Sequence, residues 1–129
     1  MKYLITGGAG YLGGHLSQAL LDAGHSVRSL DRVPSTTDGV ESVVGDICDP
    51  TSVALACQGI DAVFHAAAMM VFVGMARKAE RDLVWRVNVQ GTANVIAACQ
   101  AAGVGRLVYT SSANVSIEGE ILEADEEAA

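Results

Sequence analysis

A glycine-rich turn between a short apolar run and a helical stretch constrains the fold of this chain most. Gly7, Gly10 and Gly13 form a Gly-x-x-Gly-x-x-Gly spacing that follows apolar residues 3–5 and opens an Ala/Leu-rich stretch. Such a tight turn needs positive φ or a missing Cβ, and bare backbone can approach a pyrophosphate closely. The start of the next helix offers unpaired N–H groups to the phosphates. The turn predicts a dinucleotide site, although the spacing alone also fits a glycine-rich turn without a ligand.

An acidic residue at the end of the second apolar run favours the interpretation of the glycine turn as a ligand site. Asp31 stands 18 residues after Gly13, where a carboxylate accepts both hydroxyls of the adenosine ribose. A negative charge there repels a 2′-phosphate, which favours NAD over NADP. Arg32 follows directly, and its guanidinium could instead accommodate a 2′-phosphate or stack on adenine. We predict NAD as the cofactor, with NADP as the alternative.

The rest of the chain alternates β-branched runs with longer Ala/Leu-rich stretches, which is typical of βαβ units. The pattern predicts strands over 2–6, 26–31, 41–45, 61–65 and 106–111, and helices over 11–23, 49–57 and 80–102. Every connection carries a helix or a loop long enough for a crossover, so the sheet should be parallel and covered on both faces. We therefore predict an α/β fold as a single domain over residues 1–129. Together with the glycine turn, the pattern indicates a Rossmann doubly wound sheet, for which we expect the strand order 3-2-1-4-5.

Composition restricts the partners and the compartment. Of the fifteen acids, six lie in residues 118–129, and the remaining chain is nearly neutral without a basic patch, which argues against nucleic acid. The longest apolar segment, 62–76, is too short for a membrane span, and no signal peptide is visible. Three cysteines make no complete disulfide framework and no zinc pattern. We expect a cytoplasmic protein without a structural metal.

Five motifs, in order along the chain, resemble those of the extended short-chain dehydrogenases/reductases. They are Thr6 to Gly13 (Thr-Gly-Gly-Ala-Gly-Tyr-Leu-Gly), Gly45-Asp46-Ile47, His65-Ala66-Ala67-Ala68, Asn88-Val89-Gln90-Gly91-Thr92 and Val108-Tyr109-Thr110-Ser111-Ser112. The segments 85–92 and 108–115 look most like the 3β-hydroxysteroid and sterol-4-carboxylate dehydrogenase branch. Sugar-nucleotide epimerases, dehydratases and dihydroflavonol-type reductases share most of these letters.

The resemblance implies roles for individual residues. Asp46 would hold the adenine amino group, residues 66–68 would close over the cofactor, and His65 would be structural. Ser112 would stand at the substrate carbonyl as a catalytic residue. The cofactor contacts that the resemblance and the glycine turn imply are Gly7, Gly10, Tyr11, Leu12, Gly13, Asp31, Arg32, Asp46, Ile47, Ala66, Ala67, Ala68, Asn88, Thr110 and Ser111.

The reaction of this family also needs a tyrosine with a lysine four residues later, because a phenol is a poor base at neutral pH without a cationic neighbour. Tyr3, Tyr11 and Tyr109 are followed at that distance by glycine, histidine and alanine. We therefore expect the chain to be a truncated cofactor-binding part that is inactive alone. The missing portion should leave apolar surface exposed around Leu107 and Tyr109, which favours a homo-oligomer.

The complete enzyme would then be an NAD-dependent oxidoreductase that acts on a secondary alcohol or ketone, such as a 3β-hydroxysteroid. Two alternatives remain open at this stage. One is an NAD-dependent sugar-nucleotide epimerase or dehydratase, and the other is a non-catalytic dinucleotide-binding module.

Overall fold

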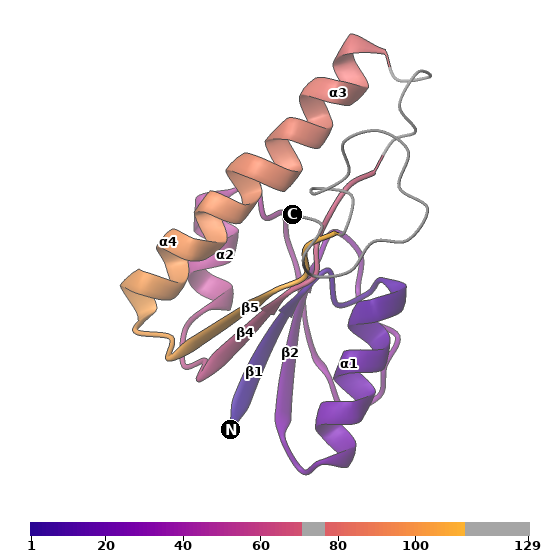
Figure 1. Cartoon of the computed structure of the whole chain (residues 1–129). Helices are drawn as coiled ribbons and strands as arrows, with labels where there is room; N and C mark the ends of the chain where they lie inside the picture. The colour runs from indigo at the N-terminus through magenta and orange to yellow at the C-terminus, as the bar shows by residue number, and fades with distance from the viewer. Residues whose placement is uncertain (71–76, 113–129) are drawn as a thin grey trace, which may run out of the picture.

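The described part of the chain forms a sheet of five parallel strands with helices on both faces (Figure 1). The computed structural model describes residues 1–70 and 77–112. The sheet runs in the order β3-β2-β1-β4-β5 and all neighbouring pairs are parallel, which confirms the predicted doubly wound fold. The strands are β1 (Lys2–Thr6), β2 (Ser26–Asp31), β3 (Glu41–Val44), β4 (Ala62–His65) and β5 (Arg106–Tyr109).

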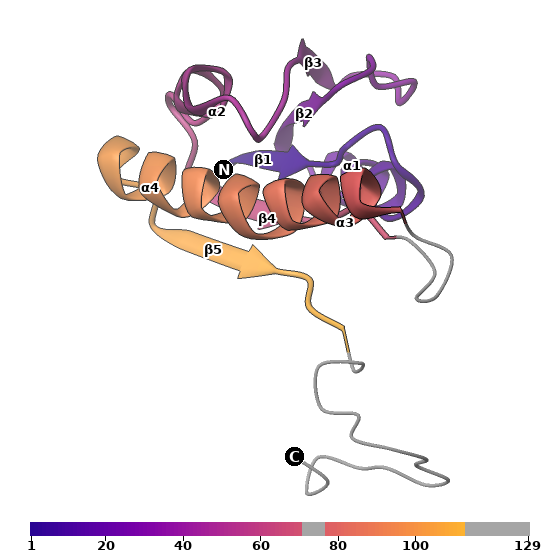
Figure 2. The ribbon, with the colours of Figure 1, turned by 90° about the horizontal axis from the view of Figure 1, so that it is seen from above.

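The helices lie on both sides of this sheet. They are α1 (Tyr11–Asp22), α2 (Pro50–Ala56), α3 (Lys78–Trp85), the π-helical η1 (Arg86–Gly91) and α4 (Thr92–Ala102). Figure 1 shows α1 on one face and α2 with α4 on the other. Seen from above, α3, η1 and α4 form one long rod, and β3 and β5 are the two edges of the sheet (Figure 2). None of the helices within 1–70 and 77–112 is long and apolar enough to cross a membrane.

The main core lies between the sheet and the α2/α4 layer. Leu4, Leu30 and Val63 of the strands are fully buried there, against Val53 of α2 and Val95 of α4. Apolar side chains at alternate strand positions share one face, and this face is the one the two helices cover. This packing of α2 and α4 on the sheet therefore fixes the positions of α4 and of the loop before α2 relative to the strand ends.

Local signals explain where two helices begin. The carboxylate of Asp49 accepts the N–H groups of Thr51 and Ser52, so α2 begins at Pro50 as its cap predicts. The Glu80 carboxylate accepts the Arg77 N–H at 2.7 Å, which starts the long helix at Lys78, two residues before the predicted start. The prediction of one regular helix over 80–102 was wrong in its middle, because residues 86–91 form a π-helical turn.

The exposed apolar surface at β5 differs in part from the prediction. Leu107 is half-buried and packs against the core, because it lies beside Val63 in the sheet. The neighbouring side chains of Val108 and Tyr109 are 48% and 49% exposed. The exposure expected at Tyr109 is confirmed, and that expected at Leu107 was wrong. The acidic segment 118–129 lies outside the described residues.

Candidate dinucleotide site

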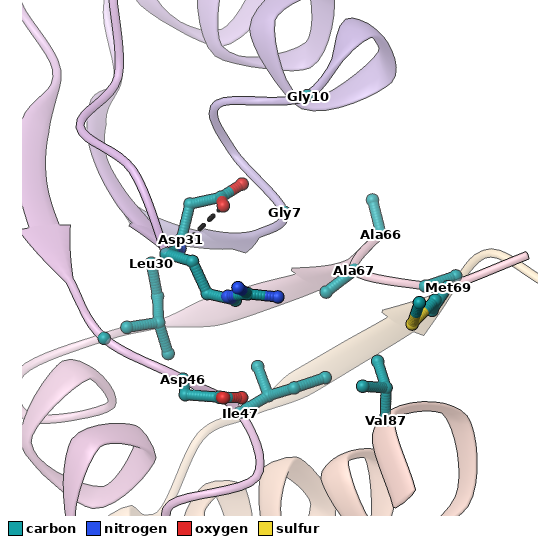
Figure 3. A pocket seen from close by; sticks show the side chains of 13 residues that line it. Gly7, Gly10, Leu30, Asp31, Asp46, Ile47, Ala66, Ala67, Met69 and Val87 are labelled. Carbon is teal, nitrogen blue, oxygen red and sulfur yellow. Dashed lines mark hydrogen bonds between the residues drawn. The ribbon is translucent and has the colours of Figure 1, made fainter. Parts of the chain in front are cut away.

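A pocket of about 320 Å³ opens where the carboxyl ends of the parallel strands meet (Figure 3). Ligands of open α/β sheets bind at this edge, at the point where the strand order reverses. In this sheet the reversal falls at β1, which has β2 on one side and β4 on the other. The pocket is lined by Gly7, Gly10, Leu30, Asp31, Arg32, Gly45, Asp46, Ile47, Ala66, Ala67, Ala68, Met69 and Val87.

The glycine turn packs so tightly that side chains would not fit. Gly7 has φ +73°, and a Cβ on it would lie 2.8 Å from the Cα of Ala67. A Cβ on Gly13 would overlap the Gly7 carbonyl oxygen. No side chain caps the start of α1 at Gly10, so the N–H groups of its first turn are offered to a ligand. This bare backbone at a helix N-terminus suits the phosphates of a dinucleotide.

Asp31 lies at the end of β2 beside the glycine turn (Figure 3). Its Oδ2 accepts the Ala9 N–H at 3.1 Å, and its Oδ1 accepts the Arg32 N–H at 2.6 Å. The Ala9 bond ties the turn to β2, and the Arg32 bond orients the carboxylate. Each carboxylate oxygen has a further lone pair, so the group can also accept hydroxyl groups from a ligand in the pocket.

The segment after β3 forms a second wall. Asp46 Oδ1 accepts the Cys48 N–H at 2.8 Å, which turns this loop toward α2. The Ile47 side chain is buried and packs on Gly91, where a Cβ would lie 2.6 Å from Ile47 Cδ1. Asn94 Nδ2 donates to the Ile47 carbonyl oxygen at 2.9 Å. The helix behind the wall therefore holds this loop in place.

His65 lies fully buried behind the pocket between two hydroxyl groups. Its Nδ1 is 2.6 Å from Thr6 Oγ1 and its Nε2 is 2.9 Å from Thr92 Oγ1. Because the Thr92 hydroxyl donates to the Asn88 carbonyl at 2.7 Å, it accepts from Nε2, and Nδ1 accepts from Thr6. Burial lowers the pKa of His65 to about 4, so the ring is neutral at pH 7. The ring joins β1, β4 and α4 and has no open side for a ligand.

Within the described ranges 1–70 and 77–112, no group of three or more His, Cys, Asp or Glu side chains is placed to hold a metal ion. The pocket instead combines bare backbone, small side chains and the two carboxylates of Asp31 and Asp46.

Residues 4–129 match the sequence model of the 3-beta hydroxysteroid dehydrogenase/isomerase family. The chain belongs to this family. It is 45% identical over 131 residues to a 3-beta-hydroxysteroid dehydrogenase of Mycolicibacterium neoaurum, a match that covers 97% of this chain and 36% of that protein. The resemblance inferred from the five motifs is therefore confirmed.

Two solved structures share the fold of this family member. A short-chain dehydrogenase/reductase superfamily protein from Agrobacterium tumefaciens with bound NAD is 37% identical, with a TM-score of 0.87 over 100% of this chain and 38% of that one. A UDP-glucose-4-epimerase from Stenotrophomonas maltophila, with bound NAD and formylated UDP-arabinopyranose, is 33% identical with a TM-score of 0.82, over 98% and 41%. The chain spans 36% to 41% of the length of the three relatives named here.

The structure brings most of the predicted cofactor contacts of this family member together. The predicted residues that line the pocket are Gly7, Gly10, Asp31, Arg32, Asp46, Ile47, Ala66, Ala67 and Ala68. Sequence reasoning missed Leu30, Gly45, Met69 and Val87 as lining residues. Leu30, Gly45 and Met69 directly adjoin predicted contacts in the chain, and that adjacency was the available signal.

The other predicted contacts lie around the pocket and do not line it. Gly13 is buried below the turn, while Tyr11 is 87% exposed and packs edge-on against His15. Thr110 donates from its N–H and its hydroxyl to the His65 carbonyl. The remaining residues of this group are Leu12 on the exposed side of α1, Asn88 in η1, and the exposed Ser111 and Ser112 after β5.

Proposed function

We propose that this chain binds NAD in the pocket at the carboxyl edge of its sheet. The observation that carries the proposal is that the glycine turn and the Asp31 carboxylate meet in one pocket. The missing Cβ of Gly7, which would collide with Ala67, suits a bare pyrophosphate cradle. The NAD-bound relatives of the same fold support the choice of cofactor.

Each wall of the pocket would hold one part of the cofactor. Gly7, Gly10, Gly13 and the first turn of α1, with Tyr11 and Leu12, would hold the pyrophosphate. Asp31 would accept the ribose hydroxyls, with Arg32 beside the adenine, and Asp46 with Ile47 would bind the adenine edge. Ala66, Ala67 and Ala68 leave room for the cofactor to pass across β4.

The nicotinamide would supply the chemistry of hydride transfer, and the chain would hold the nicotinamide in position. Asn88, Thr110 and Ser111 would lie toward that end of the cofactor, and Ser112 would orient the substrate carbonyl. Proton transfer would need a tyrosine and lysine pair beyond the residues of this chain. The chain would accordingly form the dinucleotide-binding part of an oxidoreductase, over residues 1–129.

The substrate class we propose is a secondary alcohol or ketone of the 3β-hydroxysteroid type. The family match and the 45% identity to a 3-beta-hydroxysteroid dehydrogenase support it. A sugar-nucleotide epimerase is the second candidate, supported by the fold shared with a UDP-glucose-4-epimerase. The full gene product that contains this chain should reduce NAD with a 3β-hydroxysteroid and leave UDP-glucose unchanged. Interconversion of UDP-glucose without steroid oxidation would favour the epimerase.

Calorimetric titration of the chain with NAD and with NADP tests the cofactor proposal. We expect saturable binding of NAD and weaker binding of NADP. Asp31→Ala should weaken NAD binding more than NADP binding. Asp38→Ala is its matched control, because this exposed acid lies in the loop after β2 and away from the pocket lining. A folded sample that binds neither dinucleotide would contradict the proposal.

We also propose a cytoplasmic protein that self-associates. The three free cysteines fit a reducing compartment. The half-exposed Val108 and Tyr109 lie on β5, an edge strand of the sheet that the described residues form, and such edges favour association. Sedimentation of the chain should give species larger than a monomer, and a sharp monomer boundary at high concentration would contradict self-association.

A further inference from the structure

The π-helical segment η1 contacts the pocket wall that follows β4. Asn88 Oδ1 accepts the Met69 N–H at 2.8 Å, and Asn88 Nδ2 donates to the Met69 carbonyl at 2.7 Å. One side chain thus satisfies both backbone polar groups of a residue that lines the pocket. Asn88 holds this wall much as a neighbouring strand would.

The same segment and the first turn of α4 contact the opposite wall. The missing side chain of Gly91 leaves room for the Ile47 side chain, and Asn94 Nδ2 donates a hydrogen bond to the Ile47 carbonyl oxygen. Cys48 Sγ lies 3.7 Å from the Arg86 carbonyl oxygen, as a weak donor. Val87, between these contacts, lines the pocket itself. Both walls of the pocket therefore meet on residues 86–94.

The π geometry explains how one helix can serve two walls. A π turn holds one residue more than an α turn, which rotates the residues before it by roughly 100° about the axis relative to those after it. After the turn, α4 buries Val95, Ala98 and Cys99 in the core, whereas α3 before the turn has no buried residue. The core thus fixes α4, and the extra residue in η1 places Asn88 where its amide bonds the Met69 backbone.

We propose that η1 is the positioning element of the pocket, with Asn88 as the residue that sets the segment 66–69. Gly91 and Asn94 set the segment 45–47 from the same helix, so the distance between the two walls is fixed by the register of the π turn. The ligand in this inference is that of the proposed function, but the arrangement of the walls is a property of the unliganded chain. π-helical turns inside α-helices occur frequently at functional sites.

Hydrogen exchange of the unliganded chain tests the arrangement. In Asn88→Ala, we expect the Met69 amide to exchange roughly tenfold faster or more, because it loses its acceptor. The core amides of Leu4, Leu30 and Val63 should keep their rates. Gln90→Ala is the matched control, because Gln90 is an exposed residue of the same π turn, and it should change neither. An unchanged Met69 amide in Asn88→Ala would overturn the inference.

Deletion of Gln90 tests the register itself. It converts the π turn to an α turn and moves Asn88 to the place relative to α4 where Val89 now stands, 42% exposed. We expect the Met69 amide to lose protection while the Gly45 amide, which donates to the Asp31 carbonyl at 2.8 Å, keeps its protection, because Gly91 and Asn94 follow the deletion. Protection that is unchanged at Met69, or lost equally at both walls, would contradict the role of the register.

Titration with NAD separates this inference from the proposed function. Asn88→Ala and the deletion should each weaken NAD binding roughly tenfold or more in samples that remain folded at the titration temperature, whereas Gln90→Ala should bind as the parent chain does. Parent-like NAD binding in Asn88→Ala would overturn the inference and leave the proposed function standing. If the parent chain binds no NAD, the proposed function fails, and the exchange rates still decide whether η1 positions the walls.

Discussion

The Thr6 hydroxyl lies 2.6 Å from Nδ1 of the His65 ring, and neither residue is exposed to solvent. On its other side the ring donates to Thr92, whose hydroxyl donates to the Asn88 carbonyl. The Ala67 N–H also points to the Thr6 hydroxyl, at 3.4 Å. These contacts connect the pocket wall after β4 to η1 through a buried ring, so protonation of His65 should affect the fold that carries the pocket.

Stability should therefore fall at mildly acidic pH. Burial lowers the pKa of His65 from 6.5 to about 4, so the unfolded chain takes up a proton before the folded one does. The free energy of unfolding should be insensitive to this group above pH 6.5, then fall by about 1.4 kcal/mol per pH unit down to about pH 4. Urea unfolding at a series of pH values measures the slope.

The His65→Gln variant is the control for this slope, because it removes the titrating group. Glu41 and Asp49 also have lowered pKa values, through hydrogen bonds with Lys2 and Ser52 respectively. Their contributions to the free energy of unfolding are lost only as the pH falls near and below their ordinary pKa values of 4.5 and 3.8. The window between pH 6.5 and 4.5 thus isolates His65 from them. An equal slope in the parent chain and in His65→Gln would show that His65 is not the cause.

Two adjacent glycines of α1 should respond to alanine in opposite ways. A Cβ on Gly13 would overlap the Gly7 carbonyl oxygen and lie 2.6 Å from Gly8 Cα, so Gly13→Ala should lower the free energy of unfolding by about 2 kcal/mol or more. A Cβ on Gly14 would meet only Thr37 Oγ1, at 3.9 Å. Gly14→Ala should therefore stabilise by about 0.5–1 kcal/mol through helix propensity. Urea unfolding of both variants decides, and similar shifts would contradict the packing.

Local sequence signals predicted the elements that make the pocket. The apolar runs and the glycine turn act within a few residues of the chain, and the strand order is that of the Rossmann fold, which the glycine turn indicates. Asp31 was found from its place at the end of the second strand pattern, 18 residues after Gly13, and Asp46 from the resemblance of residues 45–47 to a motif of the short-chain dehydrogenases/reductases. Both line the pocket.

The π turn could not be read from the sequence, because its cause lies elsewhere in the chain. The apolar spacing over 80–102 fits a regular helix, and the contacts that go with the extra residue come from Ile47 and Met69. Val87 was missed as a lining residue for the same reason. The exposure at β5 depends likewise on the partner strand, since Leu107 is covered only because it lies beside Val63.

Alanine at Gly7 should damage both the fold and the proposed NAD site. The position has φ +73° and no space, since a Cβ would lie 2.8 Å from Ala67 N and Cα. Gly7→Ala should cost about 2 kcal/mol or more, as backbone strain and overlap add, and NAD binding should be lost. Gly24→Ala is the matched control, with φ +80° but nothing within 4 Å of the added Cβ. It should cost about 1 kcal/mol from strain alone and leave NAD affinity unchanged. Equal losses of NAD affinity in both would contradict a specific role for Gly7.

Removal of the negative charge at Asp31 should change the choice between NAD and NADP. Asp31→Asn keeps one acceptor oxygen near the Ala9 and Arg32 N–H groups, so the turn should stay attached to β2. The variant loses charge-assisted bonds to the ribose, which should weaken NAD about tenfold, and it no longer repels a 2′-phosphate, so NADP should bind as before or more tightly. Paired titrations with both dinucleotides measure the ratio, with Asp38→Asn as the exposed control. If both dinucleotides lost affinity equally, Asp31 would act only by holding the glycine turn and would not discriminate at the ribose.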